Sequence, residues 1–141
     1  MNVAGSEINS NLIIIVNDNE QSIAEVHGGM YKNLAELRET GGTASNNLFK
    51  AFGLDYIYEE NGNDIASLIS LFRKVKDTDH PIVVHIHTQK GKGYEIAEKD
   101  KEGWHWCMPF DRETGKPTIS FGDGEDIHLS LLSILCKKAK S

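Results

Sequence analysis

A run of aliphatic residues, Leu12 to Val16, ends abruptly on the polar cluster Asn17-Asp18-Asn19. Such a run predicts a strand inside a parallel sheet, covered on both faces, because neither side of it favours water. The polar cluster then stands at the carboxyl end of the strand, where open α/β sheets bind ligands. Asn and Asp oxygens suit Mg²⁺ or Ca²⁺, so one interpretation is half of a metal and diphosphate site. An ordinary turn or helix cap has the same residues, and local sequence leaves both readings open.

Strand-like and helical patterns alternate along the chain. Apolar residues at three- and four-residue steps predict helices, and β-branched runs predict strands. The alternation predicts an α/β fold, a partial doubly wound, mainly parallel sheet flanked by helices. We expect helices at 22–37, 45–53 and 65–76, short strands at 54–58 and 82–88, and the end of a helix at 2–9. The buried face of the 65–76 helix is expected to hold Leu68, Ile69, Leu71, Phe72 and Val75.

Charge and hydropathy exclude several classes of protein. A formal net charge of -6 with no basic face argues against a general nucleic-acid binder. The longest apolar run is far shorter than the roughly 20 residues of a membrane-spanning helix, and the amino terminus lacks the pattern of a secretory signal. Cys107 and Cys136 have no metal-ligand spacing, which favours reduced thiols. We therefore expect a cytoplasmic protein with no nucleic-acid or membrane partner.

Two further segments carry candidate functional residues. The loop after the 82–88 strand, Thr88-Gln89-Lys90-Gly91-Lys92-Gly93, combines glycines with lysines, which permits a phosphate contact, although these residues alone favour a solvated basic loop. His105 lies between two tryptophans and is either a proton shuttle or a packed histidine. His85 and His87 share one face of a strand, and we favour packed or cofactor-adjacent residues over a two-ligand metal pair.

Three strings occur in a fixed order: NLIIIVNDNEQSI, HPIVVHIHTQKGKGYEIAEKD and WHWCMPFDRETG. Together they resemble the thiamine-diphosphate domain of the 1-deoxy-D-xylulose-5-phosphate synthase family, in the transketolase superfamily. The resemblance covers residues 1–118 and implies a truncated thiamine-diphosphate-binding domain that lacks its first strands. Residues 119–141 form a divergent tail, in which an amphipathic helix is expected at 128–140. Between Leu37 and Ser45 the chain is shorter than the family usually is.

The resemblance also implies roles for individual residues. Asn19 matches an asparagine that binds the divalent cation, Mg²⁺, and Gln21 matches a position that binds the same cation through its backbone carbonyl. Lys90 matches a lysine near the diphosphate of thiamine diphosphate. His105 matches a catalytic histidine near the reacting thiazolium and the donor substrate. These implied roles agree with the chemistry of the side chains themselves.

The departures from the family pattern lead to further expectations. The family's Gly-Asp-Gly cation motif would lie further upstream of Asn19 than this sequence reaches, and Gly122-Asp123-Gly124 is in the wrong place to replace it. We therefore expect a fragment of a synthase that joins pyruvate to glyceraldehyde 3-phosphate, inactive alone. The alternatives are the amino-terminal component of a split transketolase and a non-catalytic remnant acting as a binding or scaffold domain. Because missing strands would expose a sheet edge, we also expect a homo-oligomer.

Overall fold

The computed structural model describes residues 1–22 and 27–119 of the chain. Within these ranges, helices and strands alternate, and the strands form one parallel sheet, which confirms the predicted α/β class. The elements, in chain order, are α1 (Asn2–Ser6), β1 (Ile13–Asp18), α2 (Gly29–Glu39), α3 (Leu48–Ala51), β2 (Asp55–Glu59), α4 (Ile65–Val75), β3 (Ile82–His87), α5 (Glu95–Lys99) and a 3-10 turn at Gly103–His105.

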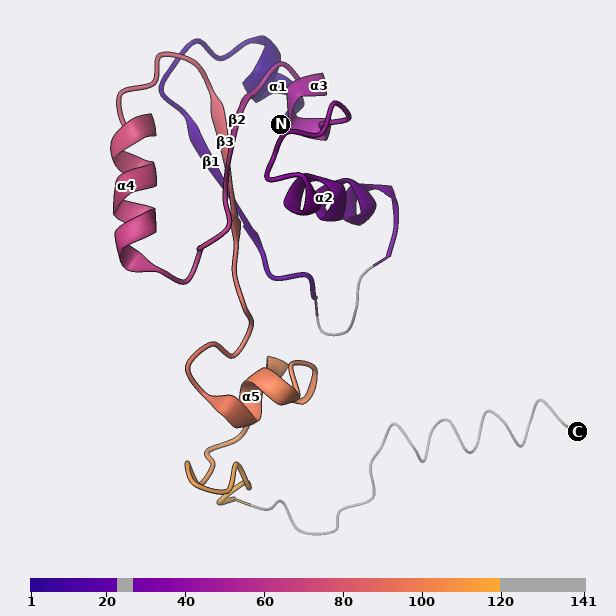
Figure 1. Ribbon diagram of the computed structural model, residues 1–141, viewed down its shortest axis with the longest axis vertical. Helices are drawn as coiled ribbons and strands as arrows, with labels where there is room; N and C mark the ends of the chain where they lie inside the picture. The colour runs from indigo at the N-terminus through magenta and orange to yellow at the C-terminus, as the bar shows by residue number, and fades with distance from the viewer. Residues whose placement is uncertain (23–26, 120–141) are drawn as a thin grey trace, which may run out of the picture. The chain divides into compact units, whose positions relative to one another are not determined.

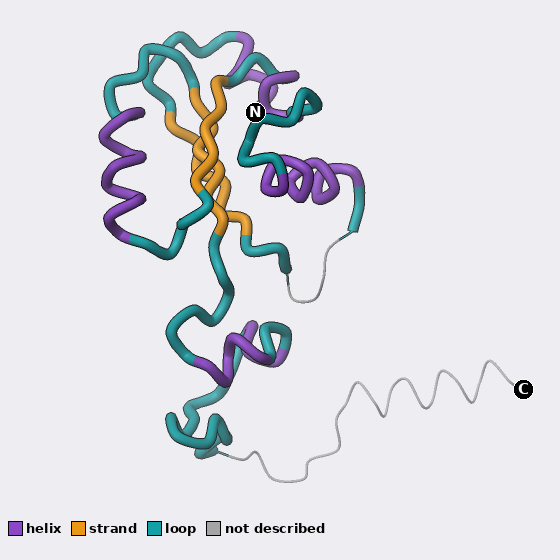
Figure 2. The backbone as a smooth tube through the Cα atoms, in the orientation of Figure 1, coloured by secondary structure: helices purple, strands orange, loops and turns teal. Residues whose placement is uncertain are grey.

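The sheet has the order β1-β3-β2, so the last strand in sequence lies in the middle (Figure 2). Both neighbours run parallel to β3, and His85 pairs with Val16 on one side and with Tyr58 on the other. All three strands therefore end at the same edge of the sheet. This register places the polar residues that follow β1 and β3 at that shared edge.

Helices cover both faces of the sheet (Figure 1). One face packs against α1, α2 and α3, around a core that includes Leu37, Phe49 and Val83. The other face packs against α4, where Leu71 and Val75 cover Val84. Alternate residues of each strand enter opposite cores, as the two-residue period of a strand requires. This sorting puts Asp18, Tyr56 and His85 on the α2 side.

β1 is less buried than predicted, and this expectation was wrong. The strand forms one edge of the described sheet instead of an interior position, so only its β3 side is paired. Ile15, on the α4 side, is 53% exposed. The apolar run indicated a strand correctly, but the position of that strand in the sheet depends on the other strands and cannot be read from the run.

The predicted helices differ from the observed ones mainly at their ends. The helix predicted over 22–37 begins at Gly29 in the structure; residues 23–26 lie outside the described ranges. Gly28 precedes it with φ 117°, a left-handed conformation that glycine adopts without strain. α4 begins at Ile65, and its N-cap is Asp64, whose side chain accepts the Ser67 amide at 2.7 Å. A short helix, α5, was not predicted.

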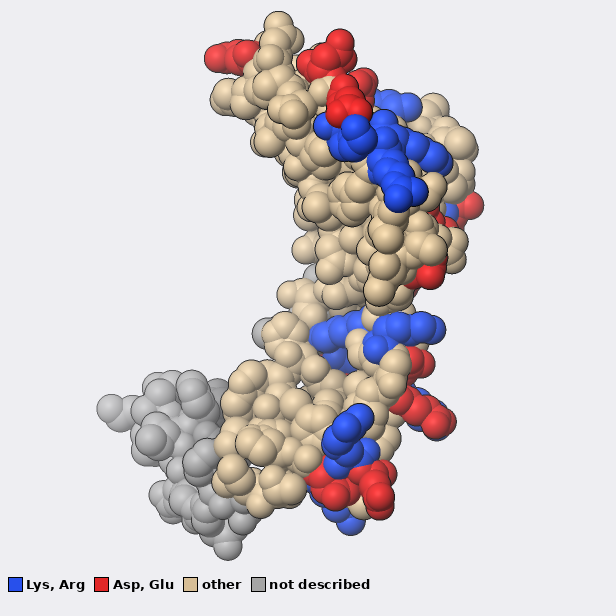
Figure 3. Space-filling model, turned by 90° about the vertical axis from the view of Figure 1, so that its left-hand side faces the viewer, with Lys and Arg blue, Asp and Glu red and all other residues tan. Residues whose placement is uncertain are grey.

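The outer surface of α4 exposes apolar side chains. Ile69, predicted to be buried, is 47% exposed, and Ile65 is 73% exposed. Figure 3 views the molecule from this side and shows a broad uncharged area below a group of Lys and Arg side chains. A helix with a 3.6-residue period places Ile65 and Ile69 on one stripe, but that stripe lies beside the one that faces the sheet.

The chain divides into two compact units, Met1–His105 and Trp106–Ser141. In the second unit, Phe110 and Pro117 form an antiparallel bridge, and Cys107 is an exposed free thiol. The division into a domain of residues 1–118 and a tail of residues 119–141 stays a prediction. None of the helices in the described ranges has the length and apolar character needed to cross a bilayer.

Candidate functional site

The loop that follows β1 contains the two predicted cation ligands, Asn19 and Gln21. Asp18 Oδ1 accepts the Glu20 amide at 3.0 Å, and Asn19 Oδ1 accepts the Gln21 amide at 3.1 Å. These are two successive turns closed by side chains. Between them, Glu20 has φ 65°, which is uncommon for a residue with a side chain. The loop therefore has a defined, tightly turned geometry.

The atoms of this loop suit a hard cation. An amide oxygen has two lone pairs, so Asn19 Oδ1 can accept the Gln21 amide and still bind a metal ion. The side-chain oxygen Oε1 of Gln21 is buried, and no hydrogen-bond partner for it exists among the described residues. A buried acceptor without a partner is costly, so a donor or a cation at this position would stabilise the loop. Oxygen donors and an orphaned acceptor thus fit a divalent cation.

The loop after β3 is held in place from both sides. Thr88 donates its amide to the Asp18 carbonyl at 2.9 Å and its hydroxyl to the Asn17 side chain at 2.6 Å. The Gln89 amide donates to the Asn63 side chain at 2.7 Å, so the turn between β2 and α4 contributes as well. These bonds fix the start of the loop that carries Lys90.

The structure brings Lys90 and His105 together. The Lys90 ammonium donates to the Ser22 carbonyl at 3.1 Å and lies 3.3 Å from Nδ1 of His105. Ser22 directly follows Gln21, so Lys90 connects the β1 loop with the histidine. Asn19 and Gln21 thus lie on the loop after β1, and Lys90, on the loop after β3, joins that loop to His105.

Sequence reasoning missed a buried polar chain behind the β1 loop. His85, which is 0% exposed, lies with Nε2 3.0 Å from Asp18 Oδ2 and with Nδ1 2.7 Å from the Tyr56 hydroxyl. Arg38 of α2 forms an ion pair with the same Asp18 oxygen. The only sequence signal was the position of Asp18 beside Asn19; its partners lie 20 or more residues away.

The pKa values of Asp18 and Tyr56, two members of this polar chain, are shifted by their surroundings. Burial alone raises the pKa of Asp18, but hydrogen bonds from His85, the Glu20 amide and Arg38, with the Arg38 charge, outweigh it and hold the pKa well below its usual range. Burial, and then the charge of Asp18, raise the pKa of Tyr56. At neutral pH, Asp18 is therefore ionised and Tyr56 is protonated.

The second strand histidine, His87, lies between two carboxylates. Its Nε2 is 2.7 Å from Glu20 and its Nδ1 is 3.1 Å from Glu60. A hydrogen bond from Tyr58, and then the contact with His87, lower the pKa of Glu60. His85 and His87 thus have separate partners. In residues 1–22 and 27–119, no three His, Cys, Asp or Glu side chains are grouped so that they could hold a metal ion.

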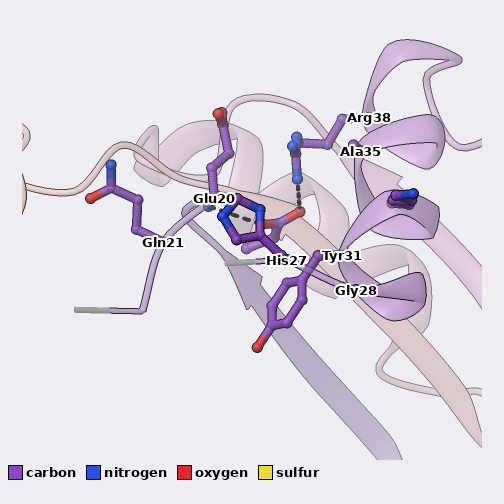
Figure 4. A pocket seen from close by; sticks show the side chains of 9 residues that line it. Glu20, Gln21, His27, Gly28, Tyr31, Ala35 and Arg38 are labelled. Carbon is purple, nitrogen blue, oxygen red and sulfur yellow. Dashed lines mark hydrogen bonds and ion pairs between the residues drawn. The ribbon is translucent and has the colours of Figure 1, made fainter. Parts of the chain in front are cut away.

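A pocket of about 320 Å³ opens beside Asp18 and α2. In Figure 4, a dashed line joins the Arg38 guanidinium to the Asp18 carboxylate, whereas the side-chain amide of Gln21 points away from Arg38. Gln21 lines this pocket, whereas Asn19, Lys90 and His105 do not, so the pocket includes only one of the four predicted site residues. Gly122-Asp123-Gly124 and the helix expected at 128–140 lie outside the described residues.

Comparison with known proteins identifies similar sequences. The family model described as 1-deoxy-D-xylulose-5-phosphate synthase matches residues 1–46 and 40–88. A protein of that name from Campylobacter hominis is 36% identical over 137 residues, covering 74% of this chain and 23% of the relative. One from Sulfurimonas denitrificans is 48% identical over 68 residues, covering 48% of this chain and 11% of the relative. The chain thus spans at most about a quarter of these relatives.

The alignments show where this chain is shorter than its relatives. An alignment with the Yersinia pseudotuberculosis synthase is 34% identical over 141 residues but covers only 77% of this chain and 23% of the relative, so the relative has residues that this chain lacks. The two matches to the family model meet at residues 40–46, between α2 and α3. This is where the sequence was expected to be shorter than the family. The family-model match covers more than half of the sequence, and the chain belongs to the 1-deoxy-D-xylulose-5-phosphate synthase family.

Proposed function

We propose that this chain supplies one side of a site for thiamine diphosphate and Mg²⁺ in a synthase that joins pyruvate to glyceraldehyde 3-phosphate, giving 1-deoxy-D-xylulose 5-phosphate and CO₂. The contact of Lys90 with both Ser22 and His105 is the observation that carries the proposal. In this contact the lysine ammonium and the imidazole lie beside a loop of oxygen donors at the carboxyl edge of a parallel sheet, where such folds bind ligands. No feature of the described residues favours the split-transketolase alternative.

The β1 loop is suited to hold the cation. Asn19 would bind it through Oδ1 and Gln21 through its backbone carbonyl, both hard oxygen atoms. The left-handed conformation of Glu20 turns the chain between them. Since the Asn19 oxygen already accepts the Gln21 amide, the two ligand residues are fixed relative to each other before any cation arrives. Preorganised ligands lower the cost of binding.

Lys90 and His105 act on the anionic and reacting parts of the ligand. The Lys90 ammonium would bind a diphosphate oxygen through a charge-assisted hydrogen bond. His105 has an imidazole that can hold or move a proton near neutral pH. Thiamine diphosphate, when bound, supplies the carbanion chemistry by which a 2-oxo acid loses CO₂. The chain's own contribution is to bind, orient and exchange protons around it.

Calorimetry of the full chain with thiamine diphosphate and Mg²⁺ tests this proposal. We expect saturable binding that requires both ligands and is weakened by Asn19→Ala. Asn11→Ala is the matched control, because Asn11 has the same side chain but is exposed and precedes β1, at the opposite end of that strand. Equal weakening by both variants, or no binding at millimolar ligand, contradicts the proposal and leaves the non-catalytic remnant as the reading that remains.

A further inference from the structure

A chain of four side chains crosses the sheet diagonally, because Asp18 is level with His87 and Tyr56 is level with Val83, to either side of His85. It runs from Tyr56 on β2 to His85 on β3, then to Asp18 on β1, and ends at Arg38 on α2. The order of these residues follows the strand order, and each bond joins neighbouring elements. His85 is fully buried and Asp18 nearly so. Polar groups at such positions are tolerated only when they are bonded to one another.

The direction of each hydrogen bond in this chain follows from the charges. An ionised Asp18 can only accept, so both Arg38 and Nε2 of His85 donate to it. In a neutral imidazole the remaining nitrogen, Nδ1, is then an acceptor, and the protonated Tyr56 hydroxyl donates to it at 2.7 Å. All donors therefore point toward Asp18, and the Asp18 carboxylate is held from two directions.

The same carboxylate also shapes the β1 loop. While Oδ2 of Asp18 faces His85 and Arg38, Oδ1 accepts the amide of Glu20 at 3.0 Å. Rotation of the carboxylate would break that bond and release Glu20 from its left-handed conformation. Asn19 and Gln21, the residues on either side of Glu20, would then lose their fixed relation.

We propose that Tyr56, His85 and Arg38 are positioning residues that act through Asp18 to hold Asn19 and Gln21 in the geometry for a divalent cation. The inference rests on the proposed function for the identity of the ligand, but the mechanical part of it concerns this loop alone. Outer partners of metal ligands commonly act in this manner, because they fix the orientation of the atoms that bind the ion.

The test removes the hydroxyl of Tyr56, at the β2 end of the polar chain. In Tyr56→Phe, hydrogen exchange at the backbone amides of Glu20 and Gln21, followed by NMR, is expected to become about tenfold faster, because the Glu20 amide bonds to Asp18 Oδ1 and the Gln21 amide closes the turn that follows directly. Arg38→Gln removes the other end and is expected to accelerate the same two amides. Arg38 is on α2 and Tyr56 is on β2, so Arg38→Gln still tests the proposal if Tyr56→Phe does not fold.

Val84→Ala is the control for general loss of stability. Val84 is next to His85 on β3 but is buried on the α4 side of the sheet, in the other core. The Val84→Ala substitution is expected to lower the stability of the fold without contacting the polar chain. Amide hydrogen exchange at Glu20 and Gln21 should therefore change only as much as it does in the rest of the sheet. If Tyr56→Phe and Arg38→Gln accelerate these two amides no more than Val84→Ala does, the positioning role is overturned.

A second readout separates this inference from the proposed function. Mn²⁺ alone serves as the probe cation, and its dissociation constant is expected to rise about tenfold in Tyr56→Phe but not in Val84→Ala. If the unaltered chain takes up no Mn²⁺, the cation site of the proposed function fails. The amide-exchange comparison then still decides whether the polar chain holds the loop.

Discussion

The Lys90 ammonium lies 3.3 Å from Nδ1 of His105 and donates a hydrogen bond to the Ser22 carbonyl as well. An ammonium group has no acceptor, so Nδ1 of His105 accepts in this contact and the imidazole proton is on Nε2. The position of the lysine thus selects the form of the histidine. The residue proposed to bind the diphosphate and the residue proposed to exchange protons are thus in direct contact.

The charge of Lys90 is expected to contribute to binding of a diphosphate. In Lys90→Met, the dissociation constant for thiamine diphosphate in the presence of Mg²⁺ should rise about ten- to hundredfold, the range for loss of a charge-assisted hydrogen bond. Isothermal titration measures it. Lys92→Met is the control, because Lys92 is in the same loop but bonds Gln89. A result in which Lys92→Met weakens binding as much as Lys90→Met would show that only net charge matters.

Asp18 is expected to make the stability of the fold depend on pH. Because partners in the folded state hold its pKa well below the unfolded value of about 4, its ionised form stabilises the fold above that value. This stabilisation is lost as the pH falls below about 4 toward the lowered pKa. Asp18→Asn should lower the free energy of unfolding at pH 7 by about 3 kcal/mol, the usual cost of breaking a buried pair.

Urea unfolding at pH 7 and at pH 3 tests this sign. The difference between the unaltered chain and Asp18→Asn should shrink at pH 3, since the unfolded Asp18 is then mostly protonated. A difference that stays the same at both pH values would mean that Asp18 acts through packing alone. Asp55→Asn is the control, because Asp55 is exposed at the start of β2 and away from Arg38.

Gly62 is expected to tolerate no side chain. Its amide donates to the His87 carbonyl at 2.8 Å, and a Cβ on Gly62 would overlap that carbonyl oxygen. Gly62→Ala should therefore lower the free energy of unfolding by about 1–3 kcal/mol, as overpacking typically does. Gly29→Ala is the control because, among the described residues outside its own helix backbone and chain neighbours, no atom lies within 4 Å of a Cβ placed there. Thermal unfolding compares the two, and equal melting temperatures would contradict the close approach.

The free edge of β1 is expected to promote self-association. Ile15 is 53% exposed on a strand that, among the described residues, is paired on one side only, and that strand has no charge before Asp18. Edges of this kind add strands from other molecules unless a charge blocks them. Light scattering should therefore detect a dimer or larger species, and Ile15→Lys should shift it toward the monomer. A monomeric unaltered chain, or an Ile15→Lys variant that associates equally, would contradict this prediction.

Local patterns predicted the strands and α4 well, because their signals are local. The β-branched runs of β1 and β3 and the apolar period of α4 depend only on nearby residues. The beginning of α2 was missed because the apolar period extends across Gly28 and Gly29. The left-handed backbone at Gly28, which precedes the helix, cannot be inferred from the spacing of apolar residues.

The candidate site was predictable only in part, for a similar reason. Asn19, Gln21, Lys90 and His105 were indicated by motif resemblance, and their roles stay predictions. The bonds of Asp18 to Arg38 and His85 join residues 20 and 67 positions apart, so no pattern in a single sequence indicates them. The exposure of Ile15 likewise depends on which strand lies beside β1, which is a property of the sheet.

The central claim is that a divalent cation binds at Asn19 and Gln21. Mn²⁺ broadens NMR signals from nuclei near it, so titration of the labelled full chain with Mn²⁺ maps the site directly. We predict early loss of the Asn19 side-chain amide and of the Glu20, Gln21 and Ser22 backbone amides, reversed by excess Mg²⁺. Signals that vanish first near Glu60 and Asp64, or uniformly over the acidic surface, would contradict the claim.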